Sequence, residues 1–425
     1  MITQVEYKQR RDLLAKDMQS NSVGVLYSSS SKIRSNDTDY PYRQNSNFYY
    51  LTGFRESNSC LMIVKRNKKF KTILFVEKKD EKKELWNGKR LGEIEAKKKF
   101  LVDEVYTTNE FEAKFKEALE FKKTLYFDFR VDYSKVKVLK RYSKNLSTHK
   151  NISILIQNMR LIKSDAEIKL IKKAIKITKK AHHKAMRYKK SNKNEYQLQA
   201  VIENKFKING AYSDAYTSIV ACGNSANTLH YVDNNKKLVD GELILIDAGC
   251  EYEYYASDIT RTIPVNGRFS EAQKELYNMV LDVQLKIIKM IKPHAKRSDL
   301  QTKSEELLCD GMIKLGILKG KRKKLIKEKA HKKYYPHGIG HWMGLDVHDE
   351  VPYKDEKNRE IPLKDGMILT IEPGIYCDKD DMNIPQIYRG IGIRIEDDIL
   401  VTKSAYKNLS KKIVKSVEDI EALSS

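Results

Sequence analysis

The stretch GELILIDAGCEYEYYASDITRTIP, Gly241 to Pro264, decides the fold of the carboxy-terminal half because it has the pattern of a β-hairpin. Leu243–Asp247 is an apolar run of strand-forming residues, and Tyr255–Pro264 carries isoleucine and threonine. The polar loop between these runs is centred midway between Tyr252 and Glu253. Two such runs joined by a short polar loop predict a pair of antiparallel strands.

Two aspartates, Asp247 and Asp258, occupy mirror positions about the centre of this predicted hairpin. Directly opposed residues on antiparallel strands project from one face with Cβ atoms roughly 4.5–5.5 Å apart, and like charges in that arrangement repel. A solvated face would tolerate such a pair. Asp247, however, interrupts an otherwise apolar strand, and a buried carboxylate is expected to be paired or metal-bound. The pair therefore predicts a cation site.

Two further apolar strands are predicted at Met367–Tyr376 and Gly390–Val401, and each carries one central glutamate, Glu372 and Glu396 respectively. In the second strand Arg394 and Glu396 are two residues apart, so their side chains share one face of the strand. We expect this charged face to turn toward the same site as the aspartate pair. The alternative is that Arg394 merely neutralises Glu396 or its neighbour Asp397.

The segment PHGIGHWMGLDVHD, Pro336 to Asp349, lies between the predicted strand pairs and holds three histidines and three glycines. Glycines there allow the backbone to come close to a ligand or metal. Carboxylates with one histidine nitrogen suit manganese, iron, cobalt or zinc, but not a thiolate-type zinc site. Four carboxylates balance two divalent ions, which leaves a metal-bridging water or hydroxide as nucleophile. Paired metals roughly 3.5–4 Å apart serve hydrolysis in this way, so the ligand set favours hydrolysis of an amide bond.

The order Asp247, Asp258, His341, Glu372 and Glu396, in the contexts LIDAG, SDITRT, HGIGHWMGLDVHD, TIEPGIY and GIRIEDD, resembles the pita-bread metallopeptidases. Within them it resembles the Xaa-Pro aminopeptidases, also called aminopeptidase P. In the amino-terminal half, RSNDTDYPYRQNSNFYYLTGF (34–54) and LWNGKRLG (85–92) look like that family's amino-terminal domain, of the bacterial type. MRLIKSDAEIKLIKKA (159–174) is similar to its domain linker and first catalytic helix.

The resemblance implies a role for each matching residue. Asp247 and Asp258 would bind one metal ion, His341 and Glu372 the other, and Asp258 and Glu396 would bridge the two. Glu372 would also move a proton from the bridging water. The other implied catalytic residues are His230 at the scissile nitrogen, His348 at the oxygen of the tetrahedral intermediate, and His337 with Arg394 in the pocket for the proline. Taken without this context, a histidine such as His230 is more often an ordinary loop residue.

Substrate contacts are implied for Tyr216, Asp37 and Trp86. In the resembled tetrameric enzymes the matching tryptophan reaches a neighbour's active site, so Trp86 would act in trans; the alternative is simple packing in a core or interface. The segment YKDEKNREIPL (353–363) departs from the family spacing. The basic residue of this segment is either Lys357 or Arg359, which leaves open the identity of a second arginine that closes the site.

At 425 residues the chain is long for one core, because domains usually contain roughly 100–200 residues. We predict an α/β (α+β) protein of two domains. The first, residues 1–160, is the amino-terminal aminopeptidase P domain, in which helices cover a mixed sheet after a basic first helix, VEYKQRRDLLAKDM (5–18). The second, residues 161–425, is the pita-bread catalytic domain, with helices near Ala166–Arg187, Glu195–Asn209 and Glu271–Lys292 framing the ligand-bearing strands.

The formal charge of +24, from 81 basic and 57 acidic residues, raises the alternative of a nucleic-acid or membrane-surface protein. The lysines are spread along the whole chain, and the densest block, KGKRKKLIKEKAHKK (319–333), has no aromatic residues for base stacking. We read this block as the solvated face of a helix and predict neither nucleic acid nor membrane as partner. The amino terminus lacks a secretory pattern, and no run of about 18 apolar residues occurs. Five scattered cysteines form no metal or disulfide pattern, which predicts a reduced, cytoplasmic protein.

Together these features predict a metal-dependent Xaa-Pro aminopeptidase that acts on peptides with proline at the second position. We expect two divalent metal ions, manganese first, with zinc, cobalt or iron as alternatives, and a homo-oligomer, either dimer or tetramer. A prolidase, restricted to Xaa-Pro dipeptides, shares the ligand set and is the main alternative. The other is a non-catalytic pita-bread module that binds proteins or histones. The intact ligands argue against that module, and they exclude a metal-free creatinase-type hydrolase.

Overall fold

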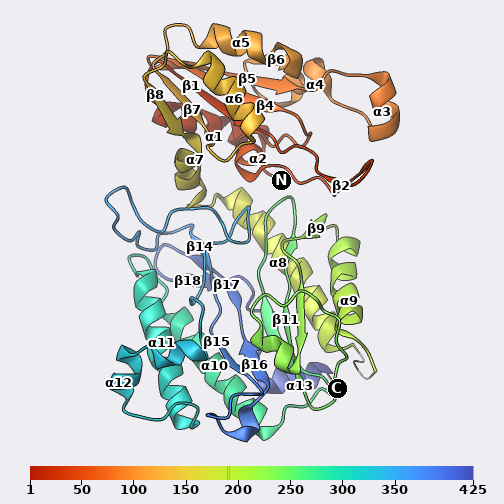
Figure 1. The fold of residues 1–425 in the computed structure, drawn as a ribbon, viewed down its shortest axis with the longest axis vertical. Coiled ribbons are helices and arrows are strands. Elements are labelled where there is room, and N and C mark those ends of the chain that lie inside the picture. The colour runs from red at the N-terminus through yellow and green to blue at the C-terminus, as the bar shows by residue number, and fades with distance from the viewer. Residues whose placement is uncertain (189, 191, 425) are drawn as a thin grey trace. The chain divides into compact units, whose positions relative to one another are not determined.

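The computed structural model describes residues 1–188, 190 and 192–424. It divides into two compact units, Met1–Arg160 and Leu161–Ser425 (Figure 1). The polypeptide is a mixture of helices and strands throughout, as expected for an α/β (α+β) chain.

The amino-terminal unit is built on a six-stranded mixed sheet with the strand order β6-β5-β4-β1-β7-β8. Strand β4 runs antiparallel to both β1 and β5, whereas the outer pairs β5/β6, β1/β7 and β7/β8 are parallel. Apolar runs such as SVGVLY and CLMIVKR supply the central strands and bury nearly all their side chains, because helices cover the sheet. The strands are β1 (Ser22–Tyr27), β4 (Cys60–Arg66), β5 (Lys69–Val76), β6 (Glu104–Thr107), β7 (Thr124–Phe127) and β8 (Thr148–Asn151), with a small hairpin of β2 (Ile33–Ser35) and β3 (Thr38–Asp39).

The helices of this unit begin with the expected basic helix, α1 (Gln4–Asp17), whose first turn is capped by the Thr3 hydroxyl. The others are α2 (Ser46–Thr52), α3 (Glu81–Asn87), α4 (Gly92–Lys99), the 3₁₀ turn η1 (Thr108–Glu110), α5 (Phe111–Ala118), α6 (Tyr133–Tyr142) and α7 (Ile152–Arg160). Helix α3 differs from the other α-helices of this unit because it buries none of its residues.

In the carboxy-terminal unit, helices flank a set of short antiparallel sheets (Figure 1). The helices are α8 (Asp165–Met186), α9 (Glu195–Ile208), α10 (Glu271–Lys289), α11 (Arg297–Lys314), α12 (Arg322–Lys327) and α13 (Val417–Ser424), with 3₁₀ turns η2 (Gly223–Asn227), η3 (Ala330–Lys333) and η4 (Gln386–Tyr388). The strands are β9 (Ser213–Asp214), β10 (Ile219–Cys222), β11 (Leu243–Asp247), β12 (Cys250–Glu251), β13 (Thr260–Pro264), β14 (Ile368–Ile371), β15 (Gly374–Cys377), β16 (Ile391–Arg394), β17 (Asp397–Val401) and β18 (Tyr406–Asn408).

The two longest helices of this unit, α8 and α10, begin at capping boxes. Ser164 caps α8 and pairs with Glu167, and Ser270 caps α10 and pairs with Gln273. In such a box the side chains satisfy backbone N–H groups that the first turn leaves unpaired. Both helices then turn an apolar face toward the core of the unit. The basic block at 319–333 forms α12 and η3, and none of the helices in the described residues is both long and apolar enough to cross a membrane.

The hairpin of β11 and β13 is present, but its predicted register was wrong by two residues. Asp247 lies opposite Thr260 rather than Asp258. The turn is centred between Glu253 and Tyr254, both of which have positive φ, and Tyr252 pairs with Tyr255. A tight turn of this kind usually carries glycine or asparagine, so no residue type in this loop marks the position of the turn. Because the shift is two residues, Asp258 still faces the same side as Asp247.

The two glutamates lie at breaks in strands, not at strand centres as predicted. Glu372 separates β14 from β15, and Glu396 separates β16 from β17. The pairs β14/β17 and β15/β16 share one register, with Ile371 opposite Asp397 and Gly374 opposite Arg394. Continued across the breaks, this register sets Glu372 directly opposite Glu396. The mirror relation expected of the two aspartates is therefore found in the two glutamates.

Candidate active site

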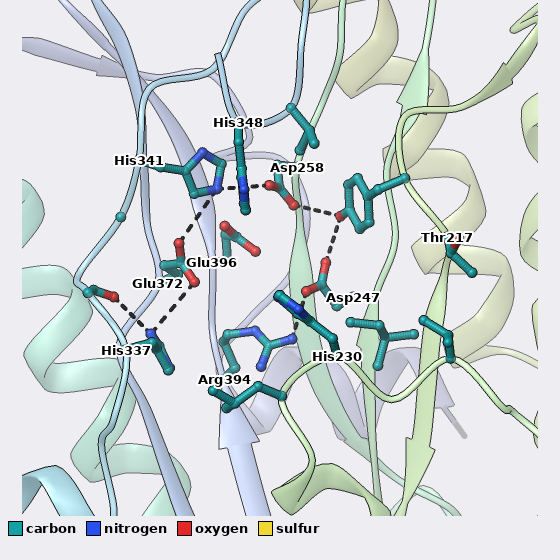
Figure 2. A pocket seen from close by; sticks show the side chains of 17 residues that line it. Thr217, His230, Asp247, Asp258, His337, His341, His348, Glu372, Arg394 and Glu396 are labelled. Carbon is teal, nitrogen blue, oxygen red and sulfur yellow. Dashed lines mark hydrogen bonds and ion pairs between the residues drawn. The ribbon is translucent and has the colours of Figure 1, made fainter. Parts of the chain in front are cut away.

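A cavity of about 560 Å³ opens between these strands in the carboxy-terminal unit (Figure 2). All of the site residues predicted in that unit line it: Tyr216, His230, Asp247, Asp258, His337, His341, His348, Glu372, Arg394 and Glu396. They come from β11, β16, the breaks at the two glutamates and the loops around them. Segments separated by up to 180 positions thus contribute to one small volume.

The five predicted metal ligands all line this cavity. Asp258, His341 and Glu396 each offer a ligand atom, and these atoms lie within 4.8 Å of one another. His341 Nε2 is 3.2 Å from Asp258 Oδ2 and 3.6 Å from Glu372 Oε1, as the dashed lines in Figure 2 show. The Nδ1–H of His341 donates to the carbonyl of Trp342 at 3.0 Å, which leaves Nε2 as the nitrogen that faces the carboxylates.

Tyr216 joins the two aspartates. Its hydroxyl is 2.6 Å from Asp247 Oδ1 and 2.6 Å from Asp258 Oδ1. Burial and the two carboxylates raise the pKa of Tyr216 well above its usual range, so the phenol remains protonated. The residue is predicted as a substrate contact; the structure places its hydroxyl against the two carboxylates, and its side chain lines the cavity.

Arg394 pairs with Asp247 and with neither of the acids considered from the sequence. Its Nη2 is 2.6 Å from Asp247 Oδ2. Asp397 is instead held by Arg261, at 2.7 Å, and Glu396 accepts a hydrogen bond from Thr260 at 2.7 Å. The guanidinium of Arg394 therefore forms part of the cavity wall opposite His341.

Tyr376 is a site residue that sequence reasoning missed. Arg394 Nη1 donates to its hydroxyl oxygen at 2.9 Å, and the hydroxyl donates to His337 Nε2 at 2.8 Å, while His337 Nδ1–H donates to the carbonyl of Gly338 at 2.8 Å. Burial and the charge of Arg394 lower the pKa of His337 to about 3, so its ring is neutral and can accept this bond. A signal was available, because Tyr376 follows Glu372 at an interval of four along extended chain and so shares its face.

The carboxylates raise one another's pKa values. Burial and the charges of Asp258, Glu372 and Asp247 raise the pKa of Glu396 well above its usual range, and burial raises that of Glu372 to about 7. Burial alone would lower the pKa of His341, but its hydrogen bond to Asp258 and the nearby carboxylates raise it to about 9. Buried like charges at this spacing repel, and a cation among them relieves the repulsion.

The donor set fits two divalent ions. It consists of buried or half-buried carboxylate oxygens and one imidazole nitrogen that is already oriented by a carbonyl. Hard oxygen donors with one nitrogen match first-row divalent cations. The five cysteines are free and buried, and none lines the cavity, so the donors of the site are oxygen and nitrogen.

His348 and His230 line the cavity and are exposed. The rings of His348 and His341 are in edge contact, with centroids 4.1 Å apart, and Figure 2 shows them side by side. His230 also lines the cavity, and in Figure 2 it is drawn on the side away from His341 and His348. Both imidazoles can therefore reach a molecule that enters the cavity.

The remaining predicted substrate contacts are not in this cavity. Asp37 lies in the exposed turn between β2 and β3, and Trp86 is 85% exposed on α3, both in the amino-terminal unit. The exposure of Trp86 contradicts the alternative that its side chain packs in the core of the amino-terminal unit. Of the two basic candidates in the 353–363 segment, Arg359 is 2.6 Å from Asp355 in its own loop, and Lys357 is exposed in the same turn.

Comparison with known proteins places these observations in a family. Residues 169–403 match the model of metallopeptidase family M24, and residues 7–126 match that of the aminopeptidase P N-terminal domain. The chain is 40% identical over 418 residues to the Xaa-Pro aminopeptidase of Haemophilus influenzae, covering 98% of this chain and 96% of that protein. It is 38% identical over 448 residues to human Xaa-Pro aminopeptidase 3, covering 100% of this chain and 86% of that protein.

Solved structures give the same result. Zinc-substituted Escherichia coli aminopeptidase P in complex with product superimposes with a TM-score of 0.96 at 36% identity, covering 100% of this chain and 98% of that one. Proline aminopeptidase P II from Yersinia pestis superimposes with a TM-score of 0.96 at 37% identity, covering 100% and 99% of the two chains. The pita-bread fold is thereby confirmed. The protein belongs to metallopeptidase family M24, with an amino-terminal domain of the aminopeptidase P type.

Proposed function

We propose that the protein is an Xaa-Pro aminopeptidase that removes the first residue from peptides whose second residue is proline. The observation that carries this proposal is the cavity in which the ligand set Asp247, Asp258, His341, Glu372 and Glu396 meets the group formed by His337, Tyr376 and Arg394. Relatives that cover nearly the whole chain bear the same activity in their names. Proline needs a dedicated pocket because its nitrogen carries no hydrogen and its ring fixes φ.

Two divalent ions would be held by this ligand set, one by Asp247 and Asp258, the other by His341 and Glu372, with Asp258 and Glu396 shared between them. When bound, such a pair supplies hydrolysis with an acidified water and polarises the attacked carbonyl. We infer manganese as the ion in the cell, although the donor set also suits zinc, cobalt and iron.

Glu372 is the general base in this proposal. Its carboxylate lies at the centre of the site, 3.6 Å from His341 Nε2 and 3.8 Å from His337 Nδ1. The hydroxyl of Thr370 donates to its Oε1 at 3.2 Å, which holds the carboxylate in place. A positioned carboxylate of this kind can take a proton from the attacking water and return it to the leaving group.

The exposed histidines act on the substrate. His348 is next to His341, where an N–H donor can stabilise the oxygen that becomes negative in the tetrahedral intermediate. His230 is placed on the other side, where it can meet the nitrogen of the scissile bond. That nitrogen is tertiary in an Xaa-Pro bond, so it can only accept a hydrogen bond as the bond breaks.

The proline ring is received by the wall of His337, Tyr376 and Arg394. The hydrogen bonds among these side chains hold the neutral imidazole and the phenol in fixed orientation. The two outlying residues, Asp37 and Trp86, are proposed to contact substrate from the amino-terminal unit, Trp86 in the site of a neighbouring subunit. This assignment requires a homo-oligomer, a dimer or a tetramer.

We further propose that residues 1–160 form the amino-terminal aminopeptidase P domain and residues 161–425 the catalytic domain. The compact units and the matched family models support this division. Five free, buried cysteines support a reducing compartment, for which we propose the cytoplasm.

The test is hydrolysis of an Xaa-Pro-Xaa tripeptide, an Xaa-Pro dipeptide and an Xaa-Ala-Xaa control by chelator-treated enzyme, with and without added Mn²⁺. We expect cleavage of the tripeptide that depends on the metal and spares the alanine control. Cleavage of the dipeptide alone would make the protein a prolidase. No cleavage of either peptide by metal-loaded protein would leave a binding module of the same fold.

A further inference from the structure

The strand breaks at Glu372 and Glu396 leave backbone groups that the sheet no longer pairs. The N–H of Glu372 donates to the carbonyl of Ile339 at 2.8 Å, and that of Glu396 donates to the carbonyl of Thr260 at 3.1 Å. The N–H groups of the two opposed glutamates thus point out of the ladder, while the N–H of Ile395 still donates to the carbonyl of Pro373 at 3.3 Å across the break. In the same register Ile395 lies opposite Pro373, which has no N–H to donate. The carbonyl of Ile395 therefore needs another donor, because buried carbonyls are almost always hydrogen-bonded.

A single side chain serves this carbonyl and that of Ile371. Gln284 is a fully buried residue of α10, and its Nε2 donates to the carbonyl of Ile371 at 3.2 Å and to that of Ile395 at 3.0 Å. The amide therefore links the two backbone segments beside the glutamate pair. It is attached to both strands at the position immediately before each glutamate.

The orientation of this amide is determined by chemistry. Lys415 Nζ is 2.7 Å from Gln284 Oε1 and also contacts Asp397, which Arg261 holds from the other side. An ammonium group can only donate, and a carbonyl can only accept. The amide oxygen must therefore face Lys415, and the NH₂ group must face the two carbonyls.

We propose that Gln284 is a positioning residue of the metal centre. Its amide ties Ile371, at the end of β14, to Ile395, between β16 and β17, and so sets the spacing of Glu372 and Glu396. This rests on the proposed function in one respect, namely that the two glutamates are metal ligands. Their carboxylates belong to opposed backbone positions, so a change in the separation of the two backbone segments changes the distance between their ligand oxygens. Metal affinity responds strongly to such supporting hydrogen bonds, typically by 10–100-fold.

Two substitutions distinguish the hydrogen bonds that the Gln284 amide donates to the two carbonyls from the one that it accepts from Lys415. Gln284→Met keeps the approximate size of the side chain and removes both the donor and the acceptor. Gln284→Glu keeps an oxygen for Lys415 and removes the donor to the carbonyls. If the tie between the strands is what matters, both variants lose affinity for Mn²⁺ by about 10–100-fold.

Gln273→Glu is the matched control. Gln273 lies on the same helix, is 6% exposed, and also donates through Nε2 to a backbone carbonyl, that of Gly241 at 2.7 Å. Glutamate is equally suited to its place in the capping box. We expect this variant to bind Mn²⁺ within about twofold of the wild-type protein, since none of its contacts touches the glutamates.

The experiment is titration of the metal-depleted full-length proteins with Mn²⁺ by calorimetry, with the fold of each variant checked by circular dichroism, and peptide hydrolysis measured in parallel. Wild-type affinity in both Gln284 variants would overturn the proposal, as would a loss in Gln284→Met that Gln284→Glu does not share, because Lys415 would then be the relevant partner. Should Gln284→Met fail to fold, Gln284→Glu alone decides between these results. Because metal binding is measured directly, a wild-type protein that binds two ions but cleaves no proline peptide refutes the proposed function and leaves the role of Gln284 standing.

Discussion

Acidification is expected to destabilise the catalytic unit through a buried histidine on α8. His182 is 1% exposed, its Nε2–H donates to the carbonyl of Ala248 at 2.9 Å, and its Nδ1 has no hydrogen-bond partner among the described residues. A second proton on Nδ1 would therefore be buried without an acceptor. Burial accordingly lowers the pKa of His182 to about 3.

The sign and size of the effect follow from the difference between the folded and unfolded pKa values. A histidine whose pKa is lowered by folding binds its proton mainly in the unfolded chain, so its stabilising effect is complete above about pH 6.5 and is lost as the pH falls toward 3. At pH 5, about 1.5 pH units below the ordinary value, the loss is about 2 kcal/mol at 1.36 kcal/mol per unit. That loss is a large part of the free energy of unfolding, which is usually about 5–15 kcal/mol. His183, whose pKa burial lowers to about 4, adds a loss of the same sign.

The assay is urea unfolding at pH 7 and pH 5, followed by the fluorescence of Trp342, which is buried in the catalytic unit, whereas the other tryptophan, Trp86, is exposed. The substitution His182→Gln preserves a donor for the Ala248 carbonyl and cannot titrate. We expect the variant to lose about 2 kcal/mol less than the wild-type protein between the two pH values. Identical losses in both proteins would refute the assignment of a neutral, acid-sensitive His182.

Three further predictions concern the site. Asp258→Asn should abolish peptide hydrolysis and lower the metal content measured by elemental analysis, because the shared carboxylate loses its charge; two bound ions with normal turnover would contradict this. His348→Ala should reduce kcat by roughly 10²–10³ with metal content unchanged, as expected for loss of one donor to the developing oxyanion, and unchanged turnover would leave His348 a structural role only. Gly249→Ala should lower both thermal stability and Mn²⁺ affinity, since its Cβ would lie 1.8 Å from the carbonyl oxygen of Ser257 within the aspartate-bearing hairpin; wild-type melting and binding would show that the hairpin can widen without cost.

Much of the candidate site could be predicted because its chemistry is carried by local patterns. A charged residue inside an apolar strand is visible in the sequence, and the period of two along a strand tells which neighbours share its face. Asp247, Glu372 and Glu396 were found in this way, and each lines the cavity. The expected helices also appear where capping residues precede an apolar periodicity, as at Ser164 and Ser270.

Pairing between distant segments was decided by the tertiary structure. The hairpin turn falls at Glu253 and Tyr254, which have positive φ values although neither is a glycine or an asparagine. The sequence therefore does not mark the turn, and the predicted partner of Asp247 was wrong. Likewise, the partner of Arg394 is Asp247, 147 positions away, and not the acids beside it in sequence.

The sequence by itself determined which residues carry charge, donors and metal-ligand atoms, and on which face of a strand each lies, because these properties depend only on residue type and on the local period of the backbone. Only the tertiary structure decided that the two strands break at Glu372 and Glu396, that these glutamates stand opposite each other, and that Gln284 of α10 joins the chain beside them. The physical reason is that register and strand breaks are set by turns and by hydrogen bonds between elements far apart in the chain. These interactions compete with local preference and cannot be recognised from the residues of any one segment.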